Sequence, residues 1–212
     1  MAVTYRTVPP TTAAAGAAAL VPVVCDVTDP AQVETAFGRV EAELGAVEVL
    51  VANAGITRDM LLLRMGEQAW DEVIDTNLSG VYRTVRRALG PMVRAHRGRI
   101  VIVSSVVGFL GSAGQVNYAA AKAGLVGLAR SLAREVGSRG ITVNVVAPGM
   151  VDTDMIATLG EQRVEQLRSM VPLGRAATPD EVAGAVVFLS SDDAAYVTGA
   201  VLAVDGGLAM GL

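Results

Sequence analysis

Short apolar runs rich in β-branched residues alternate with longer segments of helical periodicity along the whole chain. The apolar runs predict six strands, at residues 2–5, 21–25, 47–52, 99–104, 141–146 and 200–204. Because these runs are apolar at nearly every position, both faces of the sheet are expected to be covered. The pattern therefore predicts an α/β fold, with a doubly wound parallel sheet between two layers of helices.

Two of the intervening helices carry start signals at their amino ends. Asp29 is the expected N-cap of a helix that Gly45 ends. Thr178 and Glu181 form a predicted capping box ahead of a second helix, which covers residues 182–189. These residues are folding signals and carry no chemistry.

Composition narrows the class of protein without identifying it. The 212 residues suit a single domain, 1–212. The chain has 17 basic and 21 acidic side chains, and the resulting net charge of -4 excludes electrostatic attraction to nucleic acid or to an anionic membrane. One cysteine and one histidine exclude a disulfide framework and a zinc site, so we expect no metal and a reducing, cytoplasmic location. No run of about 18 apolar residues predicts a membrane span, and residues 9–20 are expected to form a surface loop.

Tyr118 and Lys122 are the first candidates for chemistry. The alanine-rich residues around them predict a helix, and a spacing of four places the phenol and the ammonium group on one face of it. A phenol has a pKa near 10, and a nearby cation is expected to lower it by about 1 to 3 units, which would make Tyr118 useful at neutral pH. Taken alone, such a pair is more often a surface feature.

Ser105 directly follows the predicted strand 99–104. In open α/β sheets, ligands bind outside the carboxyl ends of the strands, so a hydroxyl group there can meet the phenol over a bound carbonyl. Ser104 and Ser105 alone would be ordinary turn residues at a strand end. Together with Tyr118 and Lys122 they indicate a site.

These residues and several others together resemble the short-chain dehydrogenase/reductase family. The resemblance extends from about residue 2 to the carboxyl terminus, and its motifs are Asn53-Ala54-Gly55, Asn77, Ser105, Tyr118, Lys122 and Pro148-Gly149. Within the family, the sequence is most similar to the 3-oxoacyl-[acyl-carrier-protein] reductases, through the runs at residues 53–59, 115–118, 141–149 and 205–207. The resemblance implies a Rossmann-like fold and a catalytic group of four side chains, Asn77, Ser105, Tyr118 and Lys122.

The resemblance also implies a role for each catalytic residue. Tyr118 would donate a proton to the substrate carbonyl oxygen, and Ser105 would orient that oxygen by a hydrogen bond. Lys122 would lower the pKa of the phenol and hold the nicotinamide ribose. Asn77 would anchor a water that relays protons from solvent, whereas a buried asparagine in a helix is otherwise a packing or capping residue.

A nicotinamide cofactor and its contacts follow from the same resemblance. Arg6 stands where an NADP-dependent member places a cation for the 2′-phosphate, which favours NADPH over NADH; the alternative is an exposed arginine without this role. The remaining contacts would come from Asp26 and Val27 at the adenine, from Asn53, Ala54 and Gly55 at the adenosine ribose and pyrophosphate, and from Tyr118, Lys122, Pro148, Gly149, Val151 and Thr153 at the nicotinamide.

Two further segments bear on substrate and partner. The methionine- and leucine-rich residues 150–173 correspond to the mobile substrate lid of the family, which suits an acyl chain. A basic cluster of Arg94, Arg97, Arg99 and Arg139 could receive an acidic acyl carrier protein, or could be a solvated helix end whose cations complement the helix dipole. The family resemblance implies a homotetramer, with the catalytic helix and the last strand in its interfaces.

One part of the family pattern is absent from this sequence. Family members begin with a strand, a Thr-Gly-x-x-x-Gly-x-Gly turn and a helix that hold the pyrophosphate, and no such motif occurs here. That strand normally lies between the strands predicted at residues 2–5 and 47–52, so we expect two facing edges without partners. A chain that begins here should be destabilised and bind cofactor weakly, unless something else fills the position. We expect a misplaced start or an incomplete sequence, with a genuinely shortened, inactive chain as the alternative.

The sequence therefore predicts an NADPH-dependent oxidoreductase that converts a 3-oxoacyl thioester on acyl carrier protein into the 3-hydroxyacyl thioester in fatty-acid synthesis. One alternative is a catalytically silent protein that assembles with longer relatives. Another is a reductase of the same family with a coenzyme A thioester, a polyketide or a small alcohol as substrate. The intact set of four catalytic side chains favours the enzyme, while fold and motifs do not separate the substrates.

Overall fold

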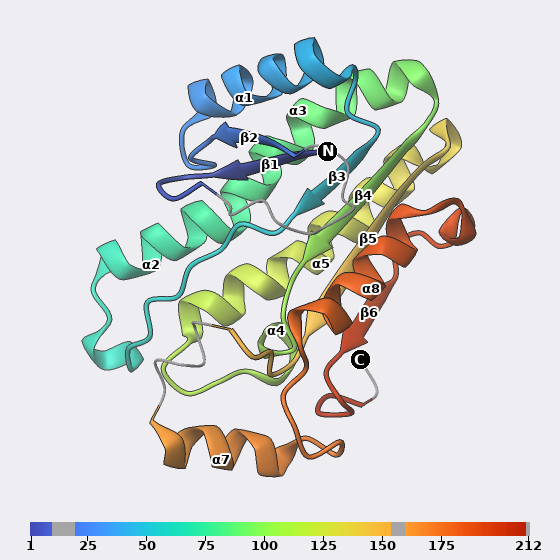
Figure 1. The fold of residues 1–212 in the computed structure, drawn as a ribbon. Helices are drawn as coiled ribbons and strands as arrows, with labels where there is room; N and C mark the ends of the chain where they lie inside the picture. The colour runs from blue at the N-terminus through green and yellow to red at the C-terminus, as the bar shows by residue number, and fades with distance from the viewer. Residues whose placement is uncertain (10–19, 154–159, 211–212) are drawn as a thin grey trace.

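Parallel strands form the middle layer of the structure, a computed structural model that describes residues 1–9, 20–153 and 160–210 (Figure 1). The strands are β1 (Ala2–Tyr5), β2 (Val21–Val24), β3 (Val49–Ala52), β4 (Gly98–Val103), β5 (Ile141–Pro148) and β6 (Val201–Val204). Each confirms a predicted strand, with ends that differ by at most two residues. Most of the loop predicted at residues 9–20 lies outside the described residues.

Helices connect these strands. They are α1 (Pro30–Leu44), α2 (Glu67–Ile74), α3 (Gly80–Ala95), α4 (Val107–Leu110), α5 (Val116–Val136), α7 (Glu161–Met170) and α8 (Pro179–Ser190), with short helical turns η1 (Leu62–Arg64), η2 (Asp75–Ser79), η3 (Gly137–Arg139) and η4 (Asp192–Ala194). The predicted caps are confirmed. The Asp29 carboxylate accepts hydrogen bonds from backbone N–H groups at the start of α1, Gly45 ends that helix, and Thr178 with Glu181 forms the capping box of α8.

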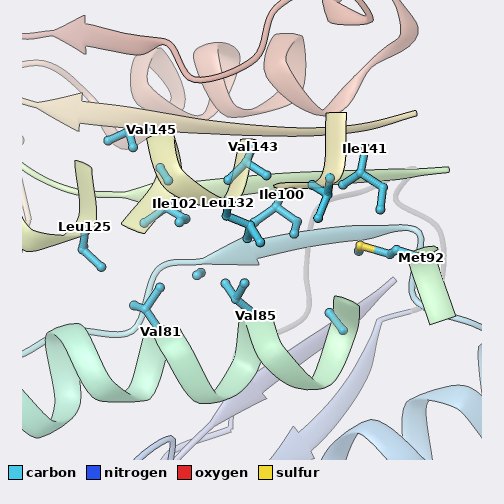
Figure 2. Close-up of a cluster of buried hydrophobic side chains, with 14 of the residues drawn as sticks. Val81, Val85, Met92, Ile100, Ile102, Leu125, Leu132, Ile141, Val143 and Val145 are labelled. Atoms are coloured by element: carbon cyan, nitrogen blue, oxygen red, sulfur yellow. The ribbon is translucent and has the colours of Figure 1, made fainter. Parts of the chain in front are cut away.

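The core lies mainly between the sheet and the helices α3 and α5. Ile100 and Ile102 of β4 stand opposite Val143 and Val145 of β5, and all four are buried among side chains of the two helices (Figure 2). On the opposite face of the sheet, α8 packs with its buried Leu189. This arrangement confirms the three-layer α/β fold.

The sheet is interrupted between β1 and β3. The described strands pair as β1–β2 and as β3–β4–β5–β6, and every pairing is parallel. A cavity of about 880 Å³ separates the two sheets and is lined by residues of both β1 and β3. Within the described part of the chain, the expected pair of facing edges without ladder partners is thus confirmed.

The face of β3 that points away from α3 is not covered by a helix in the described structure. Leu50 and Ala52 belong to the core on the α3 side, whereas Val49 and Val51 on the other face are 43% and 41% exposed. Val101, the partner of Val51 in the parallel register, is fully buried beside α8. The change from buried to exposed therefore occurs within one strand spacing.

Candidate active site

The carboxyl ends of β3, β4 and β5 bring the predicted site residues to one edge of the sheet. Asn53 follows β3, Ser105 lies two residues beyond β4, and Pro148 ends β5. The catalytic helix α5 is tied to this edge, because Ser104 Oγ donates a 2.8 Å hydrogen bond to the backbone carbonyl of Lys122. This is the edge at which open α/β sheets bind ligands.

Tyr118 and Lys122 share one face of α5. The Nζ atom of Lys122 lies over the Tyr118 ring, 5.6 Å from its centroid, and donates a 2.9 Å hydrogen bond to the carbonyl of Val103 at the end of β4. Lys122 is buried, while Tyr118 is half-buried. The bond to Val103 uses one of the three ammonium donors, so a ligand hydroxyl can accept another.

The hydroxyl group of Ser105 acts on the phenol of Tyr118 closely enough to favour its ionised form. The Ser105 oxygen also accepts a 3.2 Å hydrogen bond from the backbone N–H of Val107, which orients it. A carbonyl oxygen has two lone pairs, so one that enters here can accept a hydrogen bond from each hydroxyl group. The structure brings together the two groups that the sequence predicted to meet over a substrate.

The pKa of Tyr118 is raised from its ordinary value of about 10. Burial of the phenol is the largest cause, the hydrogen bond with Ser105 acts in the opposite direction, and the negative charge of Asp59 raises the pKa further. The prediction of a lowered pKa is wrong in its net direction, because desolvation of the phenol outweighs the favourable interactions. A raised pKa keeps the phenol protonated at neutral pH, as a proton donor requires.

Gly55 leaves a small gap between the loop after β3 and the buried ammonium group, which we call the recess at Gly55. Burial lowers the pKa of Lys122 to about 8. A Cβ atom at Gly55 would lie 3.4 Å from Oδ1 of Asn77 and 3.5 Å from Nζ of Lys122. Glycine therefore leaves space between the backbone and these two polar atoms, where a ligand can approach closely.

Asn77 lies in η2, a π-helical turn between α2 and α3 of a kind frequent at functional sites. Its side chain is fully buried and holds both backbone polar groups of Ile56, with Oδ1 accepting at 2.8 Å and Nδ2 donating at 2.9 Å. Asn77 therefore fixes the loop that follows β3. Its predicted role as anchor of a relay water stays a prediction.

Asp26 and Val27, the predicted adenine contacts, follow β2 at the same edge of the fold. The Asp26 carboxylate accepts hydrogen bonds from the backbone N–H of Thr28 at 2.9 Å and from its hydroxyl group at 2.7 Å. These bonds, and more weakly the positive charge of Arg6, lower the pKa of Asp26. Arg6 is exposed directly after β1, and an exposed guanidinium beside this loop suits a phosphate group.

Arg83 of α3 supports the adenine loop and was not identified from the sequence. Its Nη2 forms a 2.6 Å ion pair with Asp75, and its Nη1 donates a 3.2 Å hydrogen bond to the carbonyl of Val27. Because 56 positions separate Arg83 from Val27, no local pattern signals the contact.

The cavity between β1 and β3 borders residues that the sequence predicts as adenosine contacts. Val27, Asn53 and Ala54 line it together with apolar residues of both strands. Lys122 and Gly55, the predicted ribose contacts, lie outside the residues that line this cavity. No described element supplies the glycine-rich turn that the family uses for the pyrophosphate, in agreement with the absent motif.

Pro148 and Gly149, the predicted nicotinamide contacts, lie at the end of β5. The carbonyl of Pro148 accepts a 3.0 Å hydrogen bond from the backbone N–H of Val106, next to Ser105. Gly149 packs so closely on Asp205 that a Cβ atom would lie 2.8 Å from its Cα. The backbone is therefore firmly placed beside the catalytic hydroxyl groups.

The predicted lid, residues 150–173, is only partly described. Val151 forms an isolated parallel bridge with Ala177, which closes the base of the segment. Thr153 follows this bridge and is exposed. Residues 154–159 lie outside the described residues, and α7 follows them.

The basic cluster lies at the other end of the sheet. Its members are Arg94, Arg97, Arg99 and Arg139. Arg99 is at the amino end of β4, whereas Ser105 follows the carboxyl end of the same strand. Arg99 also forms a 3.2 Å ion pair with Asp192, and Arg139 lies 3.2 Å from the ring nitrogen of His96. The structure does not bring this cluster to the catalytic residues.

Two kinds of feature are absent from the described ranges. No helix there is long and apolar enough to cross a membrane. Histidine, cysteine and acidic side chains do not gather there in groups of three or more that could hold a metal ion. The buried Cys25 lies beside the adenine loop and has a raised pKa, mainly through burial.

The parallel sheet and the group of Ser105, Tyr118 and Lys122 at its carboxyl edge agree with the comparisons to known proteins. A family model described as enoyl-(acyl carrier protein) reductase matches residues 2–209. The chain belongs to the short-chain dehydrogenase/reductase family.

Similar curated proteins are named as reductases of one substrate type. The chain is 52% identical over 185 residues to the 3-oxoacyl-[acyl-carrier-protein] reductase FabG of Escherichia coli (strain K12), a match that covers 87% of this chain and 76% of that protein. It is 50% identical over 185 residues to FabG of Vibrio harveyi, with the same coverage. It is also 50% identical over 189 residues to the 3-oxoacyl-[acyl-carrier-protein] reductase MabA of Mycobacterium avium, with 89% and 74% covered.

Proposed function

We propose that this protein reduces a 3-oxoacyl thioester, carried by acyl carrier protein, to the 3-hydroxyacyl thioester, as an NADPH-dependent oxidoreductase of fatty-acid synthesis. The observation that carries the proposal is the placement of the buried Lys122 over the ring of Tyr118, with the hydroxyl group of Ser105 acting on the same phenol. The family model is described by enoyl reductases, but the relatives at 50% identity or more are named as 3-oxoacyl reductases. Two hydroxyl donors that converge on one acceptor also suit a carbonyl oxygen better than an alkene.

The residues of this chain orient the substrate and supply the proton. A 3-oxo oxygen in the site accepts hydrogen bonds from Ser105 and Tyr118, which draws electron density away from carbon 3. NADPH, when bound, supplies the hydride that adds to this carbon. As the C–H bond forms, Tyr118 gives its proton to the oxygen, so the carbonyl π bond is replaced by one C–H and one O–H bond. The ammonium group of Lys122 beside the ring stabilises the tyrosinate that remains.

Residues of three segments would hold the cofactor. Lys122 would bind the nicotinamide ribose, because its buried ammonium group keeps donors in the recess at Gly55. Arg6 would pair with the 2′-phosphate. The further contacts that we propose are Asp26, Val27, Asn53, Ala54, Tyr118, Pro148, Gly149, Val151 and Thr153.

Assembly, location and carrier docking are finer parts of the proposal. The family is generally oligomeric, and we propose a homotetramer and a cytoplasmic location. The basic cluster of Arg94, Arg97, Arg99 and Arg139 remains the docking hypothesis for the carrier. Its distance along β4 from Ser105 and the ion pair of Arg99 with Asp192 favour the alternative of a solvated helix end.

The test is a binding and turnover experiment on the purified chain. NADPH is titrated by its fluorescence, and oxidation of NADPH is followed with an acetoacetyl thioester of acyl carrier protein. We expect saturable binding and one NADPH consumed for each 3-hydroxyacyl thioester formed. If the chain neither binds NADPH nor consumes it, the reductase is excluded, and the catalytically silent assembly partner becomes the better explanation.

A further inference from the structure

We propose that Asn117 is a positioning residue for this reaction, which fixes the Tyr118 end of α5 to the loop that follows β3. The inference rests on the proposed reductase function. It adds a residue that acts through Tyr118 and through the loop.

The contacts of Asn117 connect three elements. Its Oδ1 accepts a 2.8 Å hydrogen bond from the backbone N–H of Tyr118. Its Nδ2 donates to the carbonyl of Arg58 in the loop, at 3.2 Å, and to the carbonyl of Ala69 in α2, at 3.0 Å. One fully buried amide therefore joins the start of α5, the loop and α2.

The position of Asn117 in the helix explains why such a contact matters. The first backbone N–H groups of a helix have no partner inside the helix, and the N-cap residue Gln115 makes no side-chain cap. Asn117 satisfies the N–H of Tyr118 in place of a cap. Asparagine is a poor helix former, and a buried amide without partners is costly, so its three hydrogen bonds are what make this side chain favourable here.

The same loop is held from a second side. Asn77 binds the backbone N–H and carbonyl of Ile56, two residues before Arg58. The backbone from Ile56 to Arg58 is therefore fixed at one end by the π-helical turn and at the other by α5. Because Gly55 immediately precedes this segment, Asn117 couples the phenol to the recess beside Lys122.

An outer pair of contacts continues the connection toward solvent. Gln115 donates a 2.8 Å hydrogen bond to the carboxylate of Asp59, and the backbone N–H of Met60 donates to the carbonyl of Gly114 at 2.8 Å. These partners are exposed or half-buried, so they are expected to hold the loop less firmly than the buried amide does.

The chain offers a matched control for the experiment. Asn144 of β5 is also a fully buried asparagine, which donates to the carbonyl of Val197 at 2.8 Å and accepts from the backbone N–H of Ala200 at 3.1 Å. These partners lie beside β6 and contact none of the proposed catalytic residues. Asn144→Ala thus removes a comparable buried amide without touching the connection to Tyr118.

Kinetics of Asn117→Ala and Asn144→Ala test the inference first. We expect Asn117→Ala to lower kcat for the acetoacetyl thioester by about 10- to 100-fold, because a small displacement of a catalytic group has effects of this size. NADPH affinity and KM should change by less than about threefold, and Asn144→Ala should keep kcat. In a Tyr118→Phe background, Asn117→Ala should cause no further loss of the residual rate. An equal loss of kcat in both asparagine variants would overturn the inference.

A second measurement does not require turnover. The ionisation of Tyr118 is followed by ultraviolet difference absorption, with Tyr118→Phe as the reference for the other tyrosines. Burial is the largest cause of the raised pKa of this phenol, so release of the helix end should move its titration to lower pH in Asn117→Ala and in the milder Asn117→Ser. Unchanged titration in both variants overturns the positioning role, whereas a shift in a chain without turnover would count against the proposed function alone.

Discussion

The two sheets of this protein carry different parts of one site. The four-stranded sheet supports the hydroxyl groups and the ammonium group that we propose to be catalytic, on strands that are paired and covered by helices. The two-stranded sheet supports the proposed adenosine contacts, and its inner edge faces a cavity of about 880 Å³. The groups proposed for the chemistry are therefore held by the packed core, while those proposed to bind the far end of the cofactor are not.

Packing explains why the interruption between the two sheets should weaken cofactor binding more than it lowers the rate of the reaction. Burying a valine or isoleucine side chain contributes about 1.5 to 3 kcal/mol, and the fully buried residues of β4 and β5 have this stabilisation. On β3, Val49 and Val51 remain substantially exposed. The backbone after β3 instead depends on the buried amides of Asn77 and Asn117 for its position.

The largest effect is expected from the catalytic phenol. Tyr118→Phe removes the proton donor and leaves the ring, so kcat should fall by about 10²- to 10⁴-fold, the range of general acid catalysis. NADPH affinity should stay within about twofold, because the adenosine contacts lie on the other sheet. Steady-state kinetics and fluorescence titration check both parts. Retention of more than a tenth of the wild-type rate would remove Tyr118 from its role.

The next effect concerns the cavity between the sheets. Addition of a segment with a strand, a glycine-rich turn and a helix ahead of Met1 should supply ladder partners for both facing edges and a site for the pyrophosphate. We expect NADPH to bind about 100-fold more tightly, a gain of about 2.7 kcal/mol that one well-placed phosphate site can supply. Amide hydrogen exchange should slow at β1 and β3 and stay unchanged at the β4–β5 pairing.

A matched variant separates the pyrophosphate site from simple filling of the cavity. The same added segment with its glycines changed to alanine keeps an apolar strand but blocks close approach of the backbone to phosphate. It should slow hydrogen exchange at β3 without the gain in NADPH affinity. Equal NADPH binding with and without the added segment would show that the open edge does not limit this site.

The sequence was sufficient for the architecture, and it also placed the candidate site residues at one edge of the sheet, for reasons that are local. Apolar runs marked the strands, and Asp29 and Thr178 marked helix starts, because strands and caps depend on neighbouring residues. The spacing of Tyr118 and Lys122 likewise fixed their common face. The direction of the Tyr118 pKa was wrong because burial is a property of the whole fold.

Contacts between distant segments were beyond the same reasoning. Arg83 reaches Val27 across 56 positions, and Asn117 reaches Arg58 across 59. Neither pair leaves a periodic pattern in the sequence. The distance of the basic cluster from Ser105 was also hidden, because it depends on which end of β4 each residue occupies.

The pH dependence of kcat separates the ionisation of Lys122, beside the hydroxyl groups, from that of Asp26, at the predicted adenine contacts. Burial lowers the pKa of Lys122 to about 8, so kcat should fall by up to about tenfold per pH unit above this value as the ammonium group loses its proton. Asp26 on the other side has a lowered pKa and stays ionised in this range. In Lys122→Arg, a guanidinium that stays charged should shift the fall to higher pH. A fall at the same pH in both proteins would assign it to another group.

The free energy of unfolding should rise with pH above about 8, where kcat falls. The folded pKa of Lys122 lies below its ordinary value of 10.5, so between about pH 8 and 10.5 the unfolded state binds more protons than the folded state. The contribution of this group to the free energy of unfolding therefore rises with pH. Loss of kcat with no loss of the denaturation midpoint near pH 8 to 9 would distinguish ionisation of Lys122 from unfolding.

The smallest effect is expected from substitutions on either side of the boundary at which helices stop covering the sheet, between β4 and β3. Val51 and Val101 are partners in the parallel register of β3 and β4, but Val51 is 41% exposed and Val101 is fully buried. Val101→Thr should lower the free energy of unfolding by about 1 to 3 kcal/mol, because it buries a hydroxyl group beside α8. Val51→Thr should change it by less than about 0.5 kcal/mol. Urea denaturation measures both, and a helix added over this face of β3 should raise the cost of Val51→Thr toward that of Val101→Thr, since the two valines would then be equally covered.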